Sequence, residues 1–409
     1  MPRVRQFQYA LYPNARQERL MHRLLDGECQ LYNGALSHRR EVYRLARARG
    51  VPPPRTGYVE QCRELTGVLR DDPALAAFGV TVSRGTLRRV DRAFGAFFRR
   101  VAAGQKPGYP RFRSVRRFDS VSYEDRSGWK LDQGAGRLYL MGVGHLKVRL
   151  HRRVLDEARL RSCVVRRQRV VRRRGHPPRA RWSVTVAVEL PDAVPLAPTG
   201  RRCGVDLGVR HLATVVDESG SVAVIANPRP LAAAAARLAA AQQRLARAER
   251  GSNRRATAVR DVAAAHAKVA NARRWWGHQV SHDLVRHYDL IAIEDLHPSA
   301  MSRSAAGTVE APGTNVAAKR GLNRAILDAG WGQLRRHLSY KAAEAGREVV
   351  VVSAHHTSQA CSRCGHTHPA NRRGAVFRCR SCAHTADADV NAAVNILQRA
   401  ESARQPPAA

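Results

Sequence analysis

The C-terminal half of the sequence predicts an α/β domain with a small metal-binding insert, and the N-terminal half predicts a β-rich domain interrupted by helices. Three observations lead to this prediction. Strand-like and helical segments alternate from residue 200 onward, two Cys-x-x-Cys pairs lie close together after residue 360, and residues 120–190 read as successive strands after a mostly helical stretch.

In the N-terminal half, residues 4–11 alternate between apolar and polar types, as a short strand does. A helix is predicted to start after Asn14, with Gln17 completing a capping box, and to run to about residue 48, where a glycine and three prolines follow. A second helix presents an apolar stripe that includes Leu87 and Phe94. These helices therefore form an insert in the β-rich domain.

In the C-terminal half, the predicted elements follow one another in an α/β order. They are strands at 203–207, 212–216 and 222–225, a helix pair over 231–287 broken at 251–253, a buried strand at 290–293, a loop at 299–321, a helix at 324–346 and a strand at 348–353. This order matches that of an RNase H-like fold.

The chain is strongly basic, with a formal net charge of +38 over 409 residues. Such an excess predicts a polyanionic partner, because cationic side chains release the counterions condensed on a phosphate backbone. The densest run lies at 166–181, where we expect phosphate contacts or, alternatively, a hairpin with one solvated face. The arginines chosen as candidate nucleic-acid contacts are Arg166, Arg167, Arg169, Arg172, Arg173 and Arg174.

An anionic membrane surface is the competing partner for this charge. The sequence has no run of about 18 apolar residues and no signal peptide, so we expect a cytoplasmic, nucleoid-associated protein without a membrane partner. The sequence leaves monomer and dimer open.

Three carboxylates lie where strands or helices of the predicted α/β domain end or begin. Asp206 ends the first strand, Glu294 ends the strand at 290–293, and Asp389 opens the last helix. Acidic side chains at neighbouring strand ends meet in one crevice and repel one another unless cations bind, and Mg²⁺ or Mn²⁺ suits such oxygen ligands. Two cations about 3.5–4 Å apart would then activate a water and stabilise the leaving 3′ oxygen of a phosphodiester.

Each acid alone has a simpler interpretation, as a helix cap or a turn residue. Asp389, for example, could merely cap the last helix. Asp295 and Asp387 rank below the three chosen acids, since the strand period points Glu294 and Asp295 to opposite faces. Three acids at matching places in one topology are far more specific than any one of them.

Four clustered cysteines predict a structural zinc site. Cys361 and Cys364 form one Cys-x-x-Cys pair, and Cys379 and Cys382 form a second pair after fourteen intervening residues. Four thiolates complete a tetrahedral Zn²⁺ shell, whereas a redox disulfide is the weaker alternative because two pairs occur in tandem. The ribbon lies between the last strand and the Asp389 helix, so it must sit beside the crevice, and metal loss should misplace Asp389.

Several longer motifs resemble the TnpB family of transposon-encoded RNA-guided nucleases, which are related to type V CRISPR effectors. The segments GVDLGVRHLAT, IAIEDL, HHTSQACSRCGH and CRSCAHTADADVNAAVNI carry the resemblance, and GSNRR, YPNARQERL, LYNGAL and KPGYPRFRS extend it over nearly the whole chain. The stretch from Arg273 to His278 departs from the aspartate-phenylalanine-leucine-histidine pattern usual in that family.

The resemblance implies a fold, a site and partners. The implied domains are a wedge-like β-barrel at 1–12 and 105–196, a helical recognition domain at 13–104, a RuvC-like nuclease at 200–356 and 385–401, a zinc-ribbon target-nucleic-acid-binding insert at 357–384 and a disordered tail at 402–409. Asp206, Glu294 and Asp389 would be the catalytic, Mg²⁺-binding acids, and the four clustered cysteines the Zn²⁺ ligands.

The implied activity is cleavage of double-stranded DNA that matches a transposon-derived guide RNA, next to a short target-adjacent motif. A nuclease-inactive RNA-guided repressor is a second hypothesis, but retention of all three acids speaks against it. A transposase acting without RNA is a third, and it leaves the placement of the zinc ribbon before the last acid unexplained.

Overall fold

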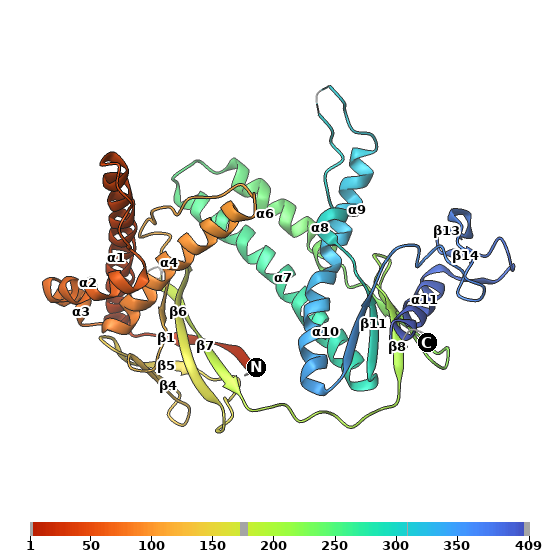
Figure 1. Cartoon of the computed structure of the whole chain (residues 1–409), viewed down its shortest axis with the longest axis horizontal. Coiled ribbons are helices and arrows are strands. Elements are labelled where there is room, and N and C mark those ends of the chain that lie inside the picture. The colour runs from red at the N-terminus through yellow and green to blue at the C-terminus, as the bar shows by residue number, and fades with distance from the viewer. Residues whose placement is uncertain (1–2, 172–178, 309, 405–409) are drawn as a thin grey trace. The chain divides into compact units, whose positions relative to one another are not determined.

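The computed structural model describes residues 3–171, 179–308 and 310–404, and the chain divides into two compact units, residues 1–192 and 193–409 (Figure 1). Within the described part of the chain, no helix is both long and apolar enough to span a bilayer. Most of the expected disordered tail at 402–409 lies outside the described residues, and Ser402 is the last residue of the final helix.

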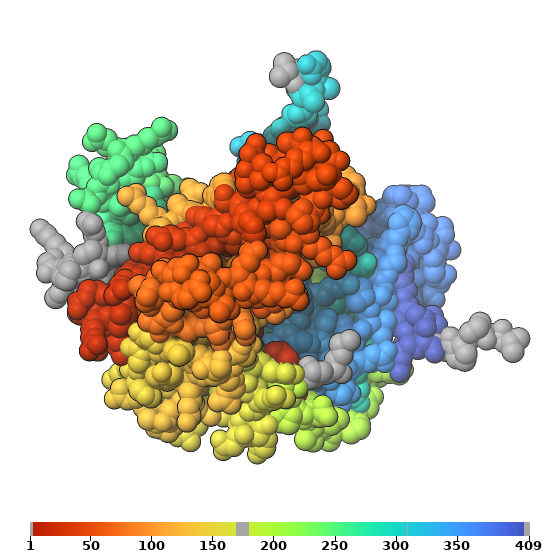
Figure 2. All heavy atoms as spheres, turned by 60° about the vertical axis from the view of Figure 1, so that its left-hand side comes forward, coloured from red at the N-terminus to blue at the C-terminus, as the bar shows by residue number. Residues whose placement is uncertain are grey.

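The first unit is an antiparallel sheet with helices inserted after its first strand. Its seven strands lie in the order β2-β6-β7-β1-β5-β4-β3. Figure 2 shows the atoms of the helical segment, red to orange, adjoining the yellow atoms of the segment that carries the later strands of this unit. The elements are β1 (Arg3–Tyr12), α1 (Ala15–Ala48), α2 (Tyr58–Asp71), α3 (Pro73–Ala76), α4 (Val80–Ala102), β2 (Ser120–Tyr123), β3 (Trp129–Asp132), β4 (Arg137–Leu140), β5 (Gly144–Arg149), β6 (Arg159–Val171) and β7 (Arg179–Leu190).

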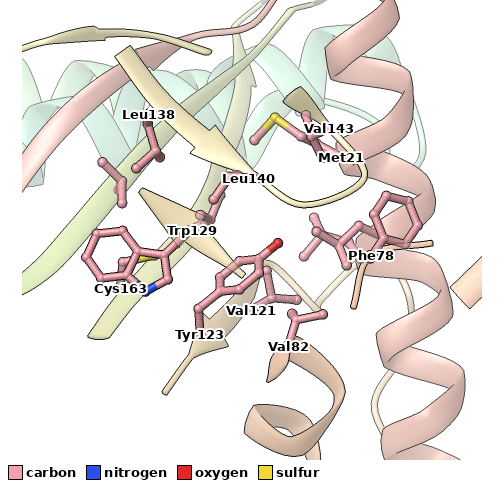
Figure 3. Packing of buried hydrophobic residues seen from close by; sticks show 14 of the residues in the cluster. Met21, Phe78, Val82, Val121, Tyr123, Trp129, Leu138, Leu140, Val143 and Cys163 are labelled. Carbon is pink, nitrogen blue, oxygen red and sulfur yellow. The ribbon is translucent and has the colours of Figure 1, made fainter. Parts of the chain in front are cut away.

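Local sequence signals explain this arrangement. The predicted capping box is present at the start of α1, where Asn14 and Gln17 exchange hydrogen bonds between side chain and backbone. Helix α4 packs directly on β2 because Gly85 has no side chain, and a Cβ there would overlap the carbonyl oxygen of Ser122. Figure 3 shows the resulting core, in which Tyr123 and Trp129 stand among aliphatic side chains of the sheet and helices.

The second unit contains the predicted α/β domain. Its five-stranded sheet has the order β10-β9-β8-β11-β12, with β8, β11 and β12 parallel and β9 antiparallel to both neighbours. The elements are β8 (Arg202–Asp206), β9 (His211–Asp217), β10 (Val222–Ala226), α5 (Pro230–Ala233), α6 (Ala235–Arg247), α7 (Asn253–His287), β11 (Leu290–Glu294), α8 (Pro298–Met301), α9 (Val316–Ala329), α10 (Trp331–Ala345), β12 (Glu348–Val352), a 3₁₀ turn (Pro369–Asn371), β13 (Arg372–Arg373), β14 (Val376–Arg378), β15 (Thr385–Asp387) and α11 (Ala388–Ser402).

Helices cover both faces of this sheet. Side chains of α7 and α10 pack on one face, in a cluster that includes Cys203, Val205 and Ile293, whereas α11 packs on the other face through Ile396 and neighbouring residues. Figure 1 shows α7 and α10 on one side of β8 and β11 and α11 on the other. The order of strands and helices predicted for this half is thus observed.

One predicted helix was wrong in its extent. The expected helix at 324–346 is two helices, because Gly330 has a φ of 71° and breaks the helix between α9 and α10. Helix α9 also begins at Val316, inside the segment expected to be a loop. A single glycine inside a helical pattern is compatible with a continuous helix and with two helices that meet at the glycine, so the pattern alone did not reveal the break.

A buried carboxylate lies in the core of the first unit. Glu28 on α1 has no exposed surface, and Ser83 Oγ donates a hydrogen bond of 2.7 Å to one of its oxygens. Its other oxygen has no hydrogen-bond partner among the described residues. Burial raises the pKa of Glu28 to about 7, although the neighbouring hydroxyls of Thr86 and Ser83 oppose this shift.

We expect Glu28→Gln to stabilise the protein at pH 8 but not at pH 5. Since the folded state keeps the Glu28 proton to a higher pH than the unfolded state, the wild-type chain loses stability as pH rises from about 4.5 to about 7. The amide of the variant does not titrate, so its free energy of unfolding at pH 8 should exceed that of the wild type by roughly 1–3 kcal/mol. Denaturant unfolding at both pH values measures it, with exposed Glu157→Gln as control. An equal effect of Glu28→Gln at both pH values would contradict the assignment.

Candidate active site and metal centre

Strand parity places the first two acids on one face of the second sheet. In β8, Cys203 and Val205 point toward α7 and α10, so Gly204 and Asp206 point toward α11. In β11, Leu290 and Ala292 pack in the α11 cluster, and Glu294 follows on the same side. The two strands are parallel neighbours and pair Ala292 with Gly204, so their carboxyl ends lie at the same edge of the sheet.

The third acid arrives on α11, which lies unusually close to β8. A Cβ at Gly204 would overlap the carbonyl oxygen of Ala393 and would lie 2.8 Å from the backbone nitrogen of Leu397. The facing side of the helix carries small, fully buried residues, including Ala392 and Ala393. This close approach brings Asp389, in the first turn of α11, to the edge where Asp206 and Glu294 lie.

All three predicted acids line one cavity of about 660 Å³. Glu294 is buried, and Asp206 and Asp389 are partly buried. The lining also includes Arg372 and Thr357, which the sequence had not singled out. The acids are thus brought together as the sequence predicted.

The electrostatics of the cavity are those of crowded carboxylates. Burial, followed by the charges of Glu294 and Asp389, raises the pKa of Asp206 to about 8. Burial also raises the pKa of Glu294, although a hydrogen bond from Thr357 opposes this shift. A bound cation would relieve the repulsion among these carboxylates and stabilise their charged forms. Three carboxylates are also the donor set that a hard divalent ion prefers.

The loop at the start of the ribbon holds Glu294 in place. The Thr357 hydroxyl donates a short hydrogen bond to Glu294 Oε1. Asn395, buried on α11, donates hydrogen bonds of 2.8 Å to the carbonyl oxygens of Thr357 and Ala360, and Asn391 donates another to Ala360. Two asparagines four residues apart on an otherwise alanine-rich helix face are the sequence signal that could have indicated this contact.

The ribbon itself supplies a cation to the cavity. Arg372, at the start of β13, pairs with Asp389 at 3.1 Å, and its charge opposes the burial that raises the pKa values of Asp206 and Glu294. Nothing in the spacing of the sequence distinguished this arginine from its neighbours.

Asp387, not Asp389, is the N-cap of α11, so the interpretation of Asp389 as a mere helix cap was wrong. Asp295 pairs with Arg335.

The four clustered cysteines form a site that fits zinc. Their sulfur atoms all lie within 4.8 Å of one another, with 3.7 Å between Cys361 and Cys382 and 3.6 Å between Cys364 and Cys379. Four sulfurs at 2.3 Å from one tetrahedral ion are about 3.8 Å apart. Backbone amides of Cys382 and Ser381 also donate to the Cys379 sulfur, which lowers its pKa to about 6 and favours the thiolate that binds metal.

The predicted nucleic-acid arginines are only partly described. Arg166 is exposed on β6. Arg167 donates hydrogen bonds to the carbonyl oxygens of Val115 and Phe118, so its guanidinium already has partners within the first unit. The side chain of Arg169 and the whole of Arg172, Arg173 and Arg174 lie outside the described residues.

The stretch that departs from the resembled family is accommodated on α7. Arg273 forms an ion pair of 2.9 Å with buried Asp328 of α9. His278 stacks on His337 of α10 with ring centroids 3.9 Å apart, and Gly277 leaves the space that His337 occupies. The helix therefore packs through these contacts, and residues 273–278 are not among those that line the acidic cavity.

Three family models match parts of the chain. One is described as a probable transposase (OrfB_IS605) and matches residues 185–305, and a helix-turn-helix domain model of the same series matches residues 1–47. A Cas12f1-like TNB domain matches residues 331–396, which include the four cysteines and Asp389. In this structure, residues 3–47 form one strand and most of one helix.

Whole-length relatives and a solved structure are also similar. InsQ of Escherichia coli K12, named as a candidate RNA-guided DNA endonuclease, is 34% identical over 97% of this chain and 92% of its own length. A Streptomyces pristinaespiralis protein with the same description is 31% identical over 96% of this chain and 88% of its own length. The Cas12f1 chain in a complex with sgRNA and target DNA covers 97% of this chain and 98% of its own, with a TM-score of 0.60 at 12% identity, a likeness of fold.

We expect Gly204→Ala to displace α11 from β8 and to destabilise the protein by roughly 1–3 kcal/mol, the usual effect of overpacking. Gly321→Ala on α9, where a Cβ would meet nothing within 4 Å, is the matched control and leaves the free energy of unfolding unchanged or slightly higher. Denaturant unfolding measures both variants. Equal stability of Gly204→Ala and wild type would mean that α11 is not in close contact with β8.

Removal of one clustered cysteine should remove the metal and loosen the first turn of α11. Cys379→Ser is expected to lose the one zinc ion per chain that elemental analysis should find in the wild type, because three thiolates no longer close the shell. Hydrogen exchange of amides around Asp389 should then rise at least tenfold. Cys62→Ser, outside the cluster, should keep both properties. Full zinc content in Cys379→Ser would sink the assignment.

Proposed function

The chain belongs to the TnpB family, and we propose that it is an RNA-guided DNA endonuclease whose active site is the acidic cavity of the second unit. The main support for this proposal is that Asp206, Glu294 and Asp389 line one cavity, which lies at the carboxyl ends of the adjacent strands β8 and β11. The sheet order, three antiparallel strands followed by two parallel ones, supports an RNase H-like, RuvC-type nuclease fold.

Asp206, Glu294 and Asp389 are proposed to be the catalytic acids and the ligands of Mg²⁺ or Mn²⁺. Divalent cations bound there would supply an activated water and would stabilise the leaving 3′ oxygen of the phosphodiester. Thr357 keeps one oxygen of Glu294 in a fixed direction, and Arg372 offsets the repulsion among the carboxylates. No described nucleophilic side chain is needed, because the attacking group is water.

The four clustered cysteines are proposed to bind Zn²⁺ in a structural role. All four positions of a tetrahedral shell are taken by sulfur, so no position remains open for catalysis. The ribbon contacts the acids at two points, through Thr357 at its start on Glu294 and through Arg372 in β13 on Asp389. Zinc would therefore fix the positions of Thr357 and Arg372 relative to the acids.

The proposed partners are a guide RNA made from the transposon end and a double-stranded target DNA. The net charge of +38 supports this, because phosphate backbones are the usual partners of so basic a chain. Base pairing with the guide would read the target, while the protein reads RNA shape and a short adjacent motif. The domain division implied by the resemblance, with a wedge-like barrel and a zinc-ribbon insert, is part of the proposal, as are the phosphate contacts of the arginines in 166–174.

Asp206→Ala should abolish DNA cleavage while leaving target binding within about twofold of wild type, because the substitution removes a cation ligand and no predicted phosphate contact. The measurement compares cleavage in Mg²⁺ with binding by gel shift, using protein loaded with the RNA that co-purifies with it. Asp283→Ala, at an exposed acid on α7, is the control and should cut normally.

Two results would count against the proposal. Cleavage by Asp206→Ala at the wild-type rate would reject the active site. Absence of a discrete co-purifying RNA, together with cutting that needs no RNA, would favour a transposase instead.

A further inference from the structure

An exposed group of aromatic rings lies on the first unit, away from its core. We define the aromatic platform as Phe97 and Phe98 of α4, Tyr109 and Phe112 of the following loop, and Arg40 of α1. Phe98, Tyr109 and Phe112 are 60%, 42% and 51% exposed. Large apolar rings gathered at a surface in this way usually mark a binding site.

The rings of the platform are held by contacts with one another. Tyr109 meets Phe97 edge-on with ring centroids 5.2 Å apart, and Phe97 meets Phe98 at the same distance. The Arg40 guanidinium lies over both loop rings, 5.6 Å from the centroid of Tyr109 and 5.1 Å from that of Phe112. The platform thus has several flat, pre-positioned faces.

The loop that carries two of the rings is fastened to α1. Asn33 accepts a hydrogen bond from the Arg113 amide and donates one to the Arg113 carbonyl, both at 2.8 Å. Phe94, below the platform, contacts Tyr109 and lies under the Arg39 guanidinium. The rings therefore need little ordering before a partner binds, which favours affinity.

The charge around the platform selects the kind of partner. Residues 99–118 contain seven arginines and lysines and no acidic residue. The nearest acids along α1 and α4, Glu41 and Asp91, are paired with Arg44 and Arg39. Flat apolar faces ringed by cations match a nucleic acid, whose bases stack while its phosphates neutralise the surrounding charge.

We propose that the aromatic platform stacks on unpaired nucleobases of the guide RNA. The inference rests on the proposed function and adds a contact surface to it. RNA is the partner because bases in loops and at ends of a folded RNA are unpaired before any target binds, whereas unpaired DNA arises only when the guide displaces the non-target strand. The contact is sequence-tolerant, since every base presents a flat face.

The test replaces two aromatic rings of the platform by leucine, which is apolar and of similar size but has no flat face for stacking. Phe98→Leu/Phe112→Leu should weaken binding of the sequenced co-purifying RNA, made in vitro, by about tenfold or more, as lost base stacking does. The slope of log affinity against log salt should stay unchanged, because no cation is removed. The variant Phe98→Leu/Phe112→Trp, which has an aromatic ring at residue 112, should recover most of the affinity. Tyr12→Leu, at an exposed ring of β1, should bind like wild type.

A second measurement needs no variant. 2-Aminopurine placed singly at unpaired positions of the RNA should be quenched at one or more sites when the wild-type protein binds. Equal RNA affinity of the double variant and wild type, with no quenched position, would overturn the platform while leaving RNA-guided cleavage intact. Unchanged RNA affinity with weaker DNA capture, or with a dimer converted to monomers, would assign the surface to DNA or to a second copy and would also overturn it. Failure of the wild type to bind RNA would overturn both proposals.

Discussion

The contact between α11 and β8 at Gly204 is the constraint on which the acidic cavity depends. Backbone meets backbone there, because one partner has no side chain and the other presents alanines. The distance from the helix to the sheet sets where Asp389 stands relative to Asp206, and parallel pairing of β8 with β11 adds Glu294 at the same edge. The core thus determines the geometry of the site, since an acid cannot shift unless its strand or helix shifts too.

The zinc ribbon and the cavity form one connected structure within the second unit. Asn391 and Asn395 connect α11 to the loop at the start of the ribbon, Thr357 connects that loop to Glu294, and Arg372 connects the ribbon to Asp389. Crowding of buried carboxylates is unfavourable, as the raised pKa of Asp206 shows. These contacts hold the acids together despite that repulsion, as the cation site proposed for this cavity requires.

Much of the fold was predictable because local signals and tertiary contacts agreed. Asn14 and Gln17 form the expected capping box, and the strands expected at 203–207 and 290–293 coincide with β8 and β11 to within a residue. Predictions failed where the chain departed from a simple period. Gly330 splits one expected helix, and α9 extends into an expected loop.

The sequence by itself singled out the side chains proposed to carry the chemistry: three acids at element ends and four cysteines in two close pairs, because residue type and spacing limit what each can bind. Only the tertiary structure decided which residues support them. Thr357 and Arg372 reach the acids, and Phe98 and Phe112 join one surface with Arg40, through contacts between segments distant in the chain. Periodicity describes one segment at a time, whereas these contacts depend on how separate segments pack together.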